Sequence, residues 1–335
     1  MTTQFYIGVD VSKATLDWAV SDGKTIILQT QCVNSEAGIK AALKLIKVLP
    51  NFKVSEAVCC LEHTGIYCAH LLSYLHKLHF PTWLENSLQI KRAGGLQRGK
   101  NDAIDSIRIA EYAYRFRDKM QLWSPQRLVL QKLAALSVLR QRLLLIRQQL
   151  QQPINEQERF INPLLQKELV KSCQASIKAI DADLKSTDKR IHDLIQADEQ
   201  LKKLFSLVTS VPGIGPTTAT ELIIATEEFN TINNPKKLAC HAGVAPFEYQ
   251  SGSSVRGKTK VNQHARKRLK SLLHLGAMSV ICAKGELQDY YKRKVAEGKN
   301  KMLVLNSVRN KLIHRVCSVV QRQQKYDKNY TPMLA

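Results

Sequence analysis

Four acidic residues have the types and positions that phosphodiester chemistry needs. Asp10 follows the apolar run FYIGV, and Glu62 closes a second apolar run, AVCCL. Asp102 and Asp105 lie three positions apart at the start of a helical pattern, so they share one helix face. Acids placed in this way can converge on hard cations, which prefer oxygen ligands. Because four close carboxylates repel one another strongly without cations, the sequence predicts a site for two Mg²⁺ ions.

A purely structural interpretation stays open for each acid taken alone. Asp102 could simply cap its helix, and Asp10 could solvate the end of a strand. Asp17 and Asp22 are weaker candidates for the site, because both fall in a turn-rich hairpin. Four acids in this order favour the metal-site interpretation.

The elements that position these acids follow from the hydrophobic pattern of residues 1–122. Three runs rich in β-branched and aromatic residues predict consecutive strands within 4–33. Residues 35–48 switch to helical periodicity, and strand, helix and strand patterns then lead to a Gly- and Lys-rich loop at 91–101. A helix begins at Asp102. The order β-β-β-α-β-α-β-α is that of a ribonuclease H-like domain, in which the strands carrying the first two acids are neighbours.

Residues 123–205 predict a long helical arm. Glycine is almost absent there, and leucines and isoleucines recur at helical spacing along two stretches. Pro153 and Pro163 predict a break between these stretches. An antiparallel helical hairpin or coiled-coil arm fits this pattern best, with a role in spacing and oligomerisation.

A third region, residues 206–325, is predicted to be mainly helical. It opens with VPGIGP at 211–216, a Gly-x-Gly turn between two helical patterns. Such a turn allows backbone N–H groups to approach a phosphate at a helix N-terminus, so Gly213 and Gly215 are candidate nucleic-acid contacts. The turn resembles a helix-hairpin-helix motif. A plain helix–helix turn is the alternative.

A Ser- and Gly-rich loop is predicted at 249–254. Ser251 sits within it, and a serine hydroxyl surrounded by cations could attack a phosphodiester. A phosphate-gripping loop without nucleophilic chemistry is the competing interpretation. His241 and His264 lie nearby, but no Ser-His-Asp order is evident.

The composition indicates a polyanionic partner. The 335 residues carry a formal net charge of +22, with sixteen Lys and Arg against three Asp and Glu between Ser251 and Arg315. Nucleic acid is the commonest partner of such a chain. The alternative is a basic protein whose charges are only solvated and bind no polyanion. The candidate phosphate contacts in this region are Arg256, Lys258, Lys260, Arg266, Lys267 and Arg268.

The sequence contains no pattern typical of a membrane protein, a secreted protein or a zinc site. No stretch has the length of a membrane span and no signal peptide opens the chain, so a cytoplasmic, nucleoid-associated protein is expected. The eight cysteines form no C-x-x-C pair, so they predict neither a zinc ribbon nor a disulfide framework.

Taken together, these motifs resemble the DEDD-type transposases of bacterial insertion sequences, the family that includes the Piv and MooV invertases. The resemblance spans nearly the whole chain. It is carried by GVDVSK, LEHTG and KNDAID around the four acids, by VPGIGP, by AGVAPFEYQSG at 242–252, and by HARKRLK at 264–270.

The resemblance implies a RuvC-like nuclease domain in which Asp10, Glu62, Asp102 and Asp105 bind Mg²⁺. It also implies a catalytic serine that forms a transient 5′-phosphoserine link to DNA; Ser251 matches best, with Ser253 and Ser254 close by. A non-coding bridge RNA would pair with donor and target double-stranded DNA while the protein reads backbone shape. Members assemble as tetramers, with sites shared between protomers.

Two other functions compete with an RNA-guided recombinase. A hydrolytic nuclease of the Holliday-junction resolvase type would need only the four acids and water, and it leaves the serine loop unexplained. A non-catalytic nucleic-acid-binding protein on a decayed nuclease fold is the third possibility, and the presence of all four acids disfavours it.

Overall fold

The computed structural model describes residues 3–94, 102–157, 160–251, 255–261 and 265–328, and within 247–260 it describes the backbone only. The chain separates into two compact units, 1–125 and 126–335, so the helical arm belongs to the second unit. The division into 1–122, 123–205 and 206–325 remains a prediction; its boundary at 205 falls inside helix α7 (Glu199–Thr209).

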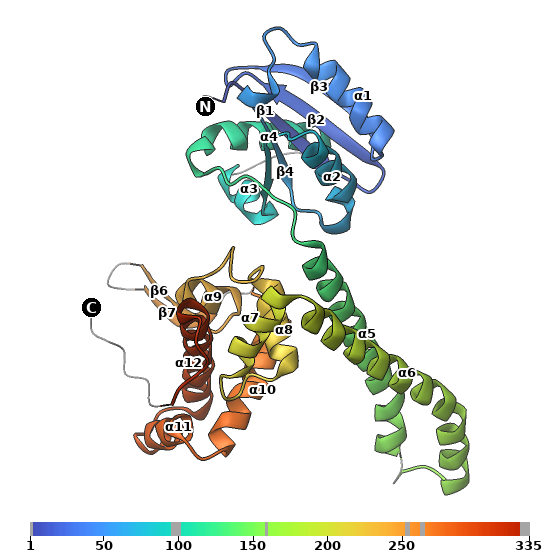
Figure 1. The fold of residues 1–335 in the computed structure, drawn as a ribbon, viewed down its shortest axis with the longest axis vertical. Coiled ribbons are helices and arrows are strands. Elements are labelled where there is room, and N and C mark those ends of the chain that lie inside the picture. The colour runs from blue at the N-terminus through green and yellow to red at the C-terminus, as the bar shows by residue number, and fades with distance from the viewer. Residues whose placement is uncertain (1–2, 95–101, 158–159, 252–254, 262–264, 329–335) are drawn as a thin grey trace. The chain divides into compact units, whose positions relative to one another are not determined.

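Unit 1 is built on a five-stranded mixed sheet in the order β3-β2-β1-β4-β5 (Figure 1). The first three strands are antiparallel, whereas β1 pairs with β4, and β4 with β5, in parallel. The predicted order of strands and helices is found, with one additional short helix, α3, between β5 and α4. The strands are β1 (Phe5–Val11), β2 (Thr15–Ser21), β3 (Ile26–Val33), β4 (Ala57–Glu62) and β5 (Thr82–Glu85).

Helices cover both faces of this sheet because its strands alternate between two cores. Side chains such as Ile7, Val9 and Leu61 pack with α1 and α2. Tyr6 and Cys60 point the other way and pack with α4. The helices are α1 (Glu36–Lys47), α2 (Ala69–Lys77), α3 (Ser87–Ala93) and α4 (Asp102–Arg115), with short 3₁₀ turns η1 (Val54–Glu56), η2 (Gly65–Cys68) and η3 (Arg117–Lys119).

Two local predictions need correction. The stretch 91–101 was expected to be a loop, but α3 extends to Ala93; residues 95–101 lie outside the described part of the chain. Pro153 was expected to mark the end of a helix, yet α5 (Leu128–Gln157) runs through it. A proline removes one N–H donor and strains one turn, and the helix resumes for four more residues. Pro163 does occupy the first turn of α6 (Pro163–Ala197), where its missing N–H costs nothing.

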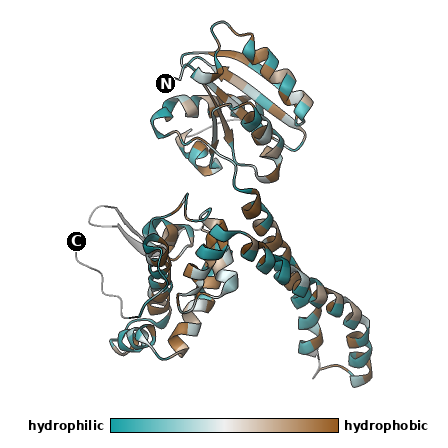
Figure 2. Ribbon diagram, in the orientation of Figure 1, coloured by the Kyte–Doolittle hydropathy of each residue, from teal (hydrophilic) through white to brown (hydrophobic). Residues whose placement is uncertain are grey.

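In unit 2, α5 and α6 lie side by side as an antiparallel pair (Figure 1). Apolar and polar residues continue along both helices to the far end of the pair (Figure 2). Leu145 and Ile146, in the second half of α5, and Leu164, in the first turn of α6, are exposed. These side chains suit a contact with another chain, and the coiled-coil role of the arm stays a prediction.

The rest of unit 2 is a helical bundle with one β-hairpin that the sequence did not predict. Its core joins the base of α5 to α7, α8, α10 and α12 through residues such as Leu133, Leu204, Leu222 and Leu273. The remaining elements are α8 (Pro216–Ala225), α9 (Pro235–His241), β6 (Pro246–Ser251), β7 (Val255–Val261), α10 (Lys267–Cys282), α11 (Glu286–Ala296) and α12 (Lys301–Arg322).

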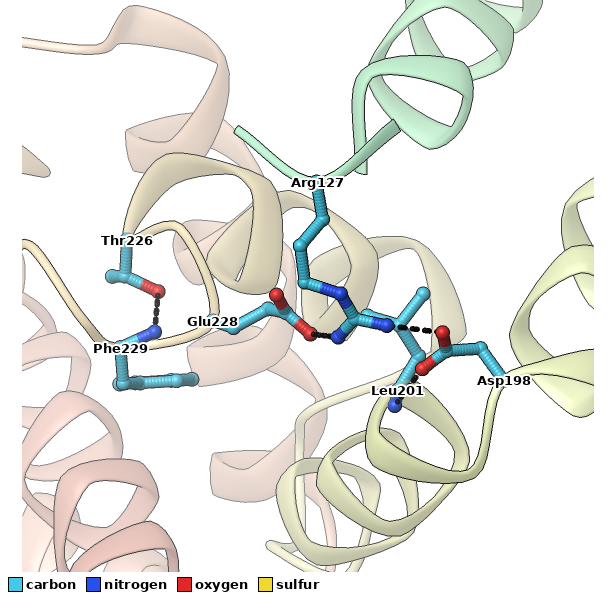
Figure 3. A network of polar contacts seen from close by, with 6 residues as sticks. All are labelled: Arg127, Asp198, Leu201, Thr226, Glu228 and Phe229. Carbon is cyan, nitrogen blue, oxygen red and sulfur yellow. Dashed lines mark hydrogen bonds and ion pairs between the residues drawn. The ribbon is translucent and has the colours of Figure 1, made fainter. Parts of the chain in front are cut away.

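An ion-pair network fastens the start of unit 2 (Figure 3). The Arg127 guanidinium donates to Asp198, which also caps α7 by accepting from Leu201 N, and to Glu228 at 2.6 Å. Glu228 lies within three consecutive left-handed residues, with φ of 48°, 60° and 65° from 227 to 229. Positive φ values strain the backbone of residues other than glycine. The hydrogen bond from Phe229 N to Thr226 Oγ1 and the contact of Glu228 with Arg127 stabilise this conformation.

Candidate active-site residues of the two units

Asp10 and Glu62 lie next to each other at one edge of the sheet. Asp10 is the penultimate residue of β1, and Glu62 is the last residue of β4. The parallel register ends with Val9 opposite Leu61, so each acid is the next residue on its strand. Because side chains alternate along a strand, both carboxylates point to the face covered by α4. The two strands that carry these acids are neighbours, as the sequence predicts.

Gly8 brings α4 down onto β1 and so positions the other two acids. A Cβ at Gly8 would lie 2.1 Å from Ser106 O and 2.3 Å from Ala110 N, so only glycine permits this approach. Asp102 and Asp105 occupy the first turn of the same helix. Asp10 lies two residues after Gly8 on β1. The N-terminus of α4 therefore lies near the end of β1 that carries Asp10.

Electrostatics show that the four acids share one neighbourhood. Burial, followed by the negative charges of Asp102, Asp105 and Glu62, raises the pKa of the Asp10 carboxyl to about 6. Asp105 is partly neutralised by Arg108, whose guanidinium lies 2.7 Å from its carboxylate. An excess of negative charge therefore remains around Asp10, and a bound cation would relieve it.

The donor set fits a hard divalent cation, since it consists of carboxylate oxygens. Within the described residues, however, no three Asp, Glu, His or Cys side chains stand close enough together to hold one ion. The acids are thus near enough to repel one another but are not arranged as a coordination sphere. Their role as Mg²⁺ ligands stays a prediction.

The sequence makes Asp17 a weak candidate within a turn-rich hairpin, and the structure places it in the middle of strand β2. It lies directly opposite Asp10 in the antiparallel register. Its carboxylate is buried and accepts hydrogen bonds from Gln31 Nε2 at 3.0 and 3.2 Å. Asp22, by contrast, is a turn residue that accepts from the N–H groups of Lys24 and Thr25. Alternation along TLDWAVS could have shown that Asp17 faces away from the core formed by Leu16 and Trp18.

Glu85 is a further carboxylate at this edge that sequence reasoning missed. It ends β5 and is the register partner of Glu62. Tyr112 Oη donates to its Oε2 at 3.0 Å, and Asn86 N donates to its Oε1 at 2.7 Å. The signal was available in the run TWLE, where Trp83 and Glu85 share a face.

Ser251 ends strand β6 and pairs with Val255 of β7. The sequence predicted a loop over 249–254, but Tyr249 to Ser251 continue the strand, because an antiparallel partner follows immediately. Ser253 and Ser254 lie outside the described residues, as does His264. Arg256, Lys258 and Lys260 occupy alternate positions of β7.

The root of this hairpin is fastened to the helical bundle on both sides. Ala245 N donates to Ala239 O at 3.2 Å, and Arg266 N donates to His241 O at 2.9 Å. From α12, Asn306 Nδ2 donates to Val244 O at 2.7 Å. The serine strand therefore projects from a fixed base.

The three cations at the start of α10 differ in their surroundings. Arg266 and Lys267 are exposed, which suits phosphate contacts. Arg268 points inward: it donates to Gln141 Oε1 at 2.8 Å and to Ser137 O at 3.2 Å, and lies 3.2 Å from Glu221. Burial lowers the pKa of its guanidinium, and Glu221 offsets part of that effect. These contacts give Arg268 a structural role within unit 2.

The two glycines of the VPGIGP turn also differ. Gly213 has a φ of +89°, and a Cβ there would lie 2.5 Å from Val280 Cγ1 and 2.9 Å from Gly276 O on α10. Packing alone therefore requires glycine at 213. Gly215 caps α8 at a φ of −81°, and a Cβ there would meet nothing within 4 Å. Open space at a helix N-terminus leaves Gly215 as the candidate for phosphate contact.

Comparisons with known proteins match both units. The family of DEDD transposases of the IS110 type, described as "Transposase", matches residues 7–163, and the "Transposase IS116/IS110/IS902 family" matches residues 205–292. The "Pilin gene-inverting protein" of Moraxella bovis is 27% identical over 328 residues, covering 96% of this chain and 98% of the relative. The "Insertion element IS116 uncharacterized 44.8 kDa protein" of Streptomyces clavuligerus is 28% identical over 120 residues, or 36% of this chain and 29% of the relative.

Proposed function

We propose that this chain is an insertion-sequence transposase of the IS110/IS116 kind, whose family models match both units, and that it cuts and rejoins donor and target double-stranded DNA through a covalent phosphoserine intermediate. The observation that carries this proposal is the crowding of four carboxylates at one sheet edge, where burial and then the charges of the other three raise the pKa of the fourth, Asp10. Structural acids are normally paired with cations, whereas this group retains a charge that suits a metal-assisted reaction on phosphate.

Asp10, Glu62, Asp102 and Asp105 would hold Mg²⁺, which supplies charge stabilisation for the attacking and leaving oxygens when bound. Ser251 would act as the nucleophile. Its Oγ forms a bond to the scissile phosphorus while the bond from phosphorus to the 3′-oxygen breaks, and the proton lost by Oγ ends on that 3′-hydroxyl. The 3′-hydroxyl of the exchanged strand then attacks the phosphoserine and restores Ser251. The number of phosphate ester bonds is unchanged, so no ATP is needed.

Nucleic acid would be held by unit 2. Arg266 and Lys267 are exposed at the start of α10, Gly215 opens onto free space, and Arg256, Lys258 and Lys260 share strand β7. The combined charge of the five basic residues supports contacts with phosphates. Sequence would be read by a non-coding bridge RNA that pairs with both DNAs.

The assembly we propose is a homo-tetramer that acts on nucleoid DNA in the cytoplasm. The exposed apolar residues of the α5–α6 pair support oligomerisation through the arm. Within the part of the chain that the structure describes, no helix is long and apolar enough to cross a membrane.

A covalent-trapping assay tests the mechanism. The protein is incubated with Mg²⁺, RNA transcribed from the element's flank, and labelled DNA carrying the element's junction, and adducts are resolved on denaturing gels and located by peptide mass spectrometry. We expect an RNA-dependent adduct at Ser251 that Ser251→Ala and Asp102→Asn both abolish. Ser172→Ala, on the exposed side of the arm, serves as the matched control.

A hydrolytic nuclease is the second candidate function, since the four acids alone would suffice for attack by water. Cleavage without an adduct, intact in Ser251→Ala, would establish that function and refute the recombinase. Binding of DNA without either product would leave only a nucleic-acid-binding protein.

A further inference from the structure

A cavity of about 590 Å³ opens in unit 1 beside the end of strand β5. It is lined from β5, α3, α4 and the segment that follows α4. Its volume lies in the range of small-ligand pockets, roughly 300–1,000 Å³. Neither the four acids nor the serine hairpin lines it, so the proposed chemistry leaves it unexplained.

The inner wall of the cavity is aromatic. The rings of Trp83 and Tyr112 lie 5.3 Å apart, and those of Tyr112 and Phe116 lie 4.8 Å apart. Trp83 and Tyr112 are buried, whereas Phe116 is only partly covered. A flat apolar ligand can therefore pack against this wall, and Phe116 offers it the most accessible ring.

The polar centre of the cavity is Glu85. Each of its carboxylate oxygens already accepts one hydrogen bond, from Tyr112 Oη or from Asn86 N. These two bonds fix the carboxylate in place and leave further lone pairs on both oxygens. A ligand that carries N–H donors would complete the set without any rearrangement of the protein.

The rim of the cavity is cationic and polar. Arg92 and Lys119 are exposed there, and Lys119 Nζ lies 5.2 Å from the centre of the Phe116 ring. Gln89 and Gln121 also line the opening. An aromatic wall, a fixed acceptor and two rim cations suit a ligand with a flat, N–H-bearing ring and a phosphate, which is a nucleotide.

The cavity adjoins the acid edge of the sheet. Glu85 is the register partner of Glu62, and His63 N donates to Glu85 O at 2.9 Å. Neighbouring strands lie about 4.8 Å apart, so a nucleotide in the cavity would be adjacent to a phosphate held by the four acids. A second, smaller cavity of about 350 Å³ is lined by both His63 and Glu85.

We propose that this cavity binds the base of a nucleotide next to the cleaved phosphate, with an amino group of the base donating to Glu85. Bases with exocyclic amino groups are favoured over thymine, and guanine is favoured most because it presents two neighbouring N–H donors. The placement beside the cleaved phosphate rests on the proposed function, whereas binding of a nucleotide does not.

Tryptophan resonances provide a test that is independent of cleavage. The chain has three tryptophans, Trp18, Trp83 and Trp123, of which only Trp83 lines the cavity. The full-length protein is labelled with 5-fluorotryptophan, Trp83→Phe assigns its ¹⁹F signal, and dGMP, dAMP, dCMP and dTMP are titrated in turn. We expect dGMP to shift the Trp83 signal saturably and dTMP to bind at least tenfold more weakly, as one or two lost hydrogen bonds imply.

Glu85→Gln should weaken dGMP binding about tenfold or more, because it replaces the fixed acceptor with a group that is half donor. Glu111 is an exposed carboxylate on α4, the helix that lines the cavity with Tyr112. Glu111→Gln should leave dGMP binding unchanged. Thermal unfolding of both variants checks that the unit stays folded. Equal effects of the two substitutions, or no shift of the Trp83 signal with any nucleotide, would overturn the base site.

The same variants are then used in the trapping assay with abasic substitutions beside the cleaved phosphate. The wild-type protein should form less adduct when one particular position is abasic. Glu85→Gln should form adduct slowly on intact DNA, and an abasic residue at that position should not lower its rate further. If nucleotides bind but no abasic position affects the adduct, the placement beside the scissile phosphate is wrong. If no adduct forms at all while dGMP still shifts Trp83, the proposed recombinase fails and the nucleotide site stands.

Discussion

The surroundings of the carboxylates differ between the two units of this protein. In unit 2 the most buried acids are paired: Glu221 contacts Arg268 and Ser137, and Glu228 contacts Arg127 (Figure 3). At the sheet edge of unit 1, burial and the charges of three other carboxylates raise the pKa of the Asp10 carboxyl to about 6. There the one ion pair that the structure gives to the four acids joins Asp105 to Arg108.

This difference separates structural from functional charge. A buried acid with an arginine partner secures helix packing, and breaking such a pair is strongly destabilising. A cluster of like charges costs stability, so its persistence indicates a use outside folding, such as holding a cation. The same reasoning distinguishes Arg268 from Arg266, although both belong to one basic run.

The largest effect is expected on cleavage when a carboxylate of the sheet edge is neutralised. Asp102→Asn should lower the rate of adduct formation by roughly 10³-fold, because it removes a group that stabilises charge in the transition state. Its thermal unfolding temperature should not fall, since one source of repulsion is gone. Asp118→Asn, an exposed acid in η3, should change neither property. If Asp102→Asn also lowered the unfolding temperature, Asp102 would have a structural role.

Breaking a pair in unit 2 should give the reverse pattern. Arg268→Ala leaves the Glu221 carboxylate buried without its cation and should lower the free energy of unfolding by about 3 kcal/mol. Arg266→Ala removes the same charge two residues earlier and should stay within about 0.5 kcal/mol of wild type. Denaturant unfolding measures both. DNA affinity, compared at fixed salt, should fall for Arg266→Ala; equal stability losses would remove the distinction between the two arginines.

The glycines of the VPGIGP turn extend the comparison to the backbone. Gly213→Ala should cost about 2 kcal/mol, because alanine at a φ of +89° is strained and its Cβ would collide with α10. Gly215→Ala should cost less than about 1 kcal/mol and instead weaken DNA binding, since its Cβ would enter open space at the start of α8. Unfolding and binding measurements on both variants decide. Unchanged affinity in Gly215→Ala would count against a phosphate contact there.

The smallest effect concerns the stability of the metal-free protein. Asp10→Asn removes the most crowded carboxylate and should raise the unfolding temperature of the metal-free protein by roughly 2–4 °C. Adding Mg²⁺ should stabilise the wild type by mass action and leave Asp10→Asn nearly unchanged. Calorimetry with and without the metal measures this. An unfolding temperature that falls in Asp10→Asn would show that the acids do not repel one another in the folded state.

Much of unit 1 was predictable from sequence because its signals are local. Strand alternation and helical periodicity depend on neighbouring residues, so the order of elements and the placement of Asp10, Glu62, Asp102 and Asp105 at strand ends and a helix start were all readable. The position of Asp17 directly opposite Asp10 was not readable, because it depends on how β2 pairs with β1. Glu85 was overlooked because its importance depends on the strand beside it.

The β-hairpin of unit 2 was missed for a related reason. Its strands are polar and basic, so no hydrophobic alternation marks them, and their pairing becomes visible only when β7 returns along β6. Ser251 was consequently assigned to a loop although it ends a strand.

The sequence by itself determined which residues carry charge and which elements bear them. Tertiary structure alone decided which charges are used for folding. Arg266 and Arg268 look alike in the run HARKRLK, but the partners of Arg268 lie 131 residues away at Ser137 and on α8 at Glu221. Periodicity reports which side of a helix is buried, and it does not report which distant group will be found there. The approach of α4 to Gly8 is decided in the same way, by packing between segments about a hundred residues apart.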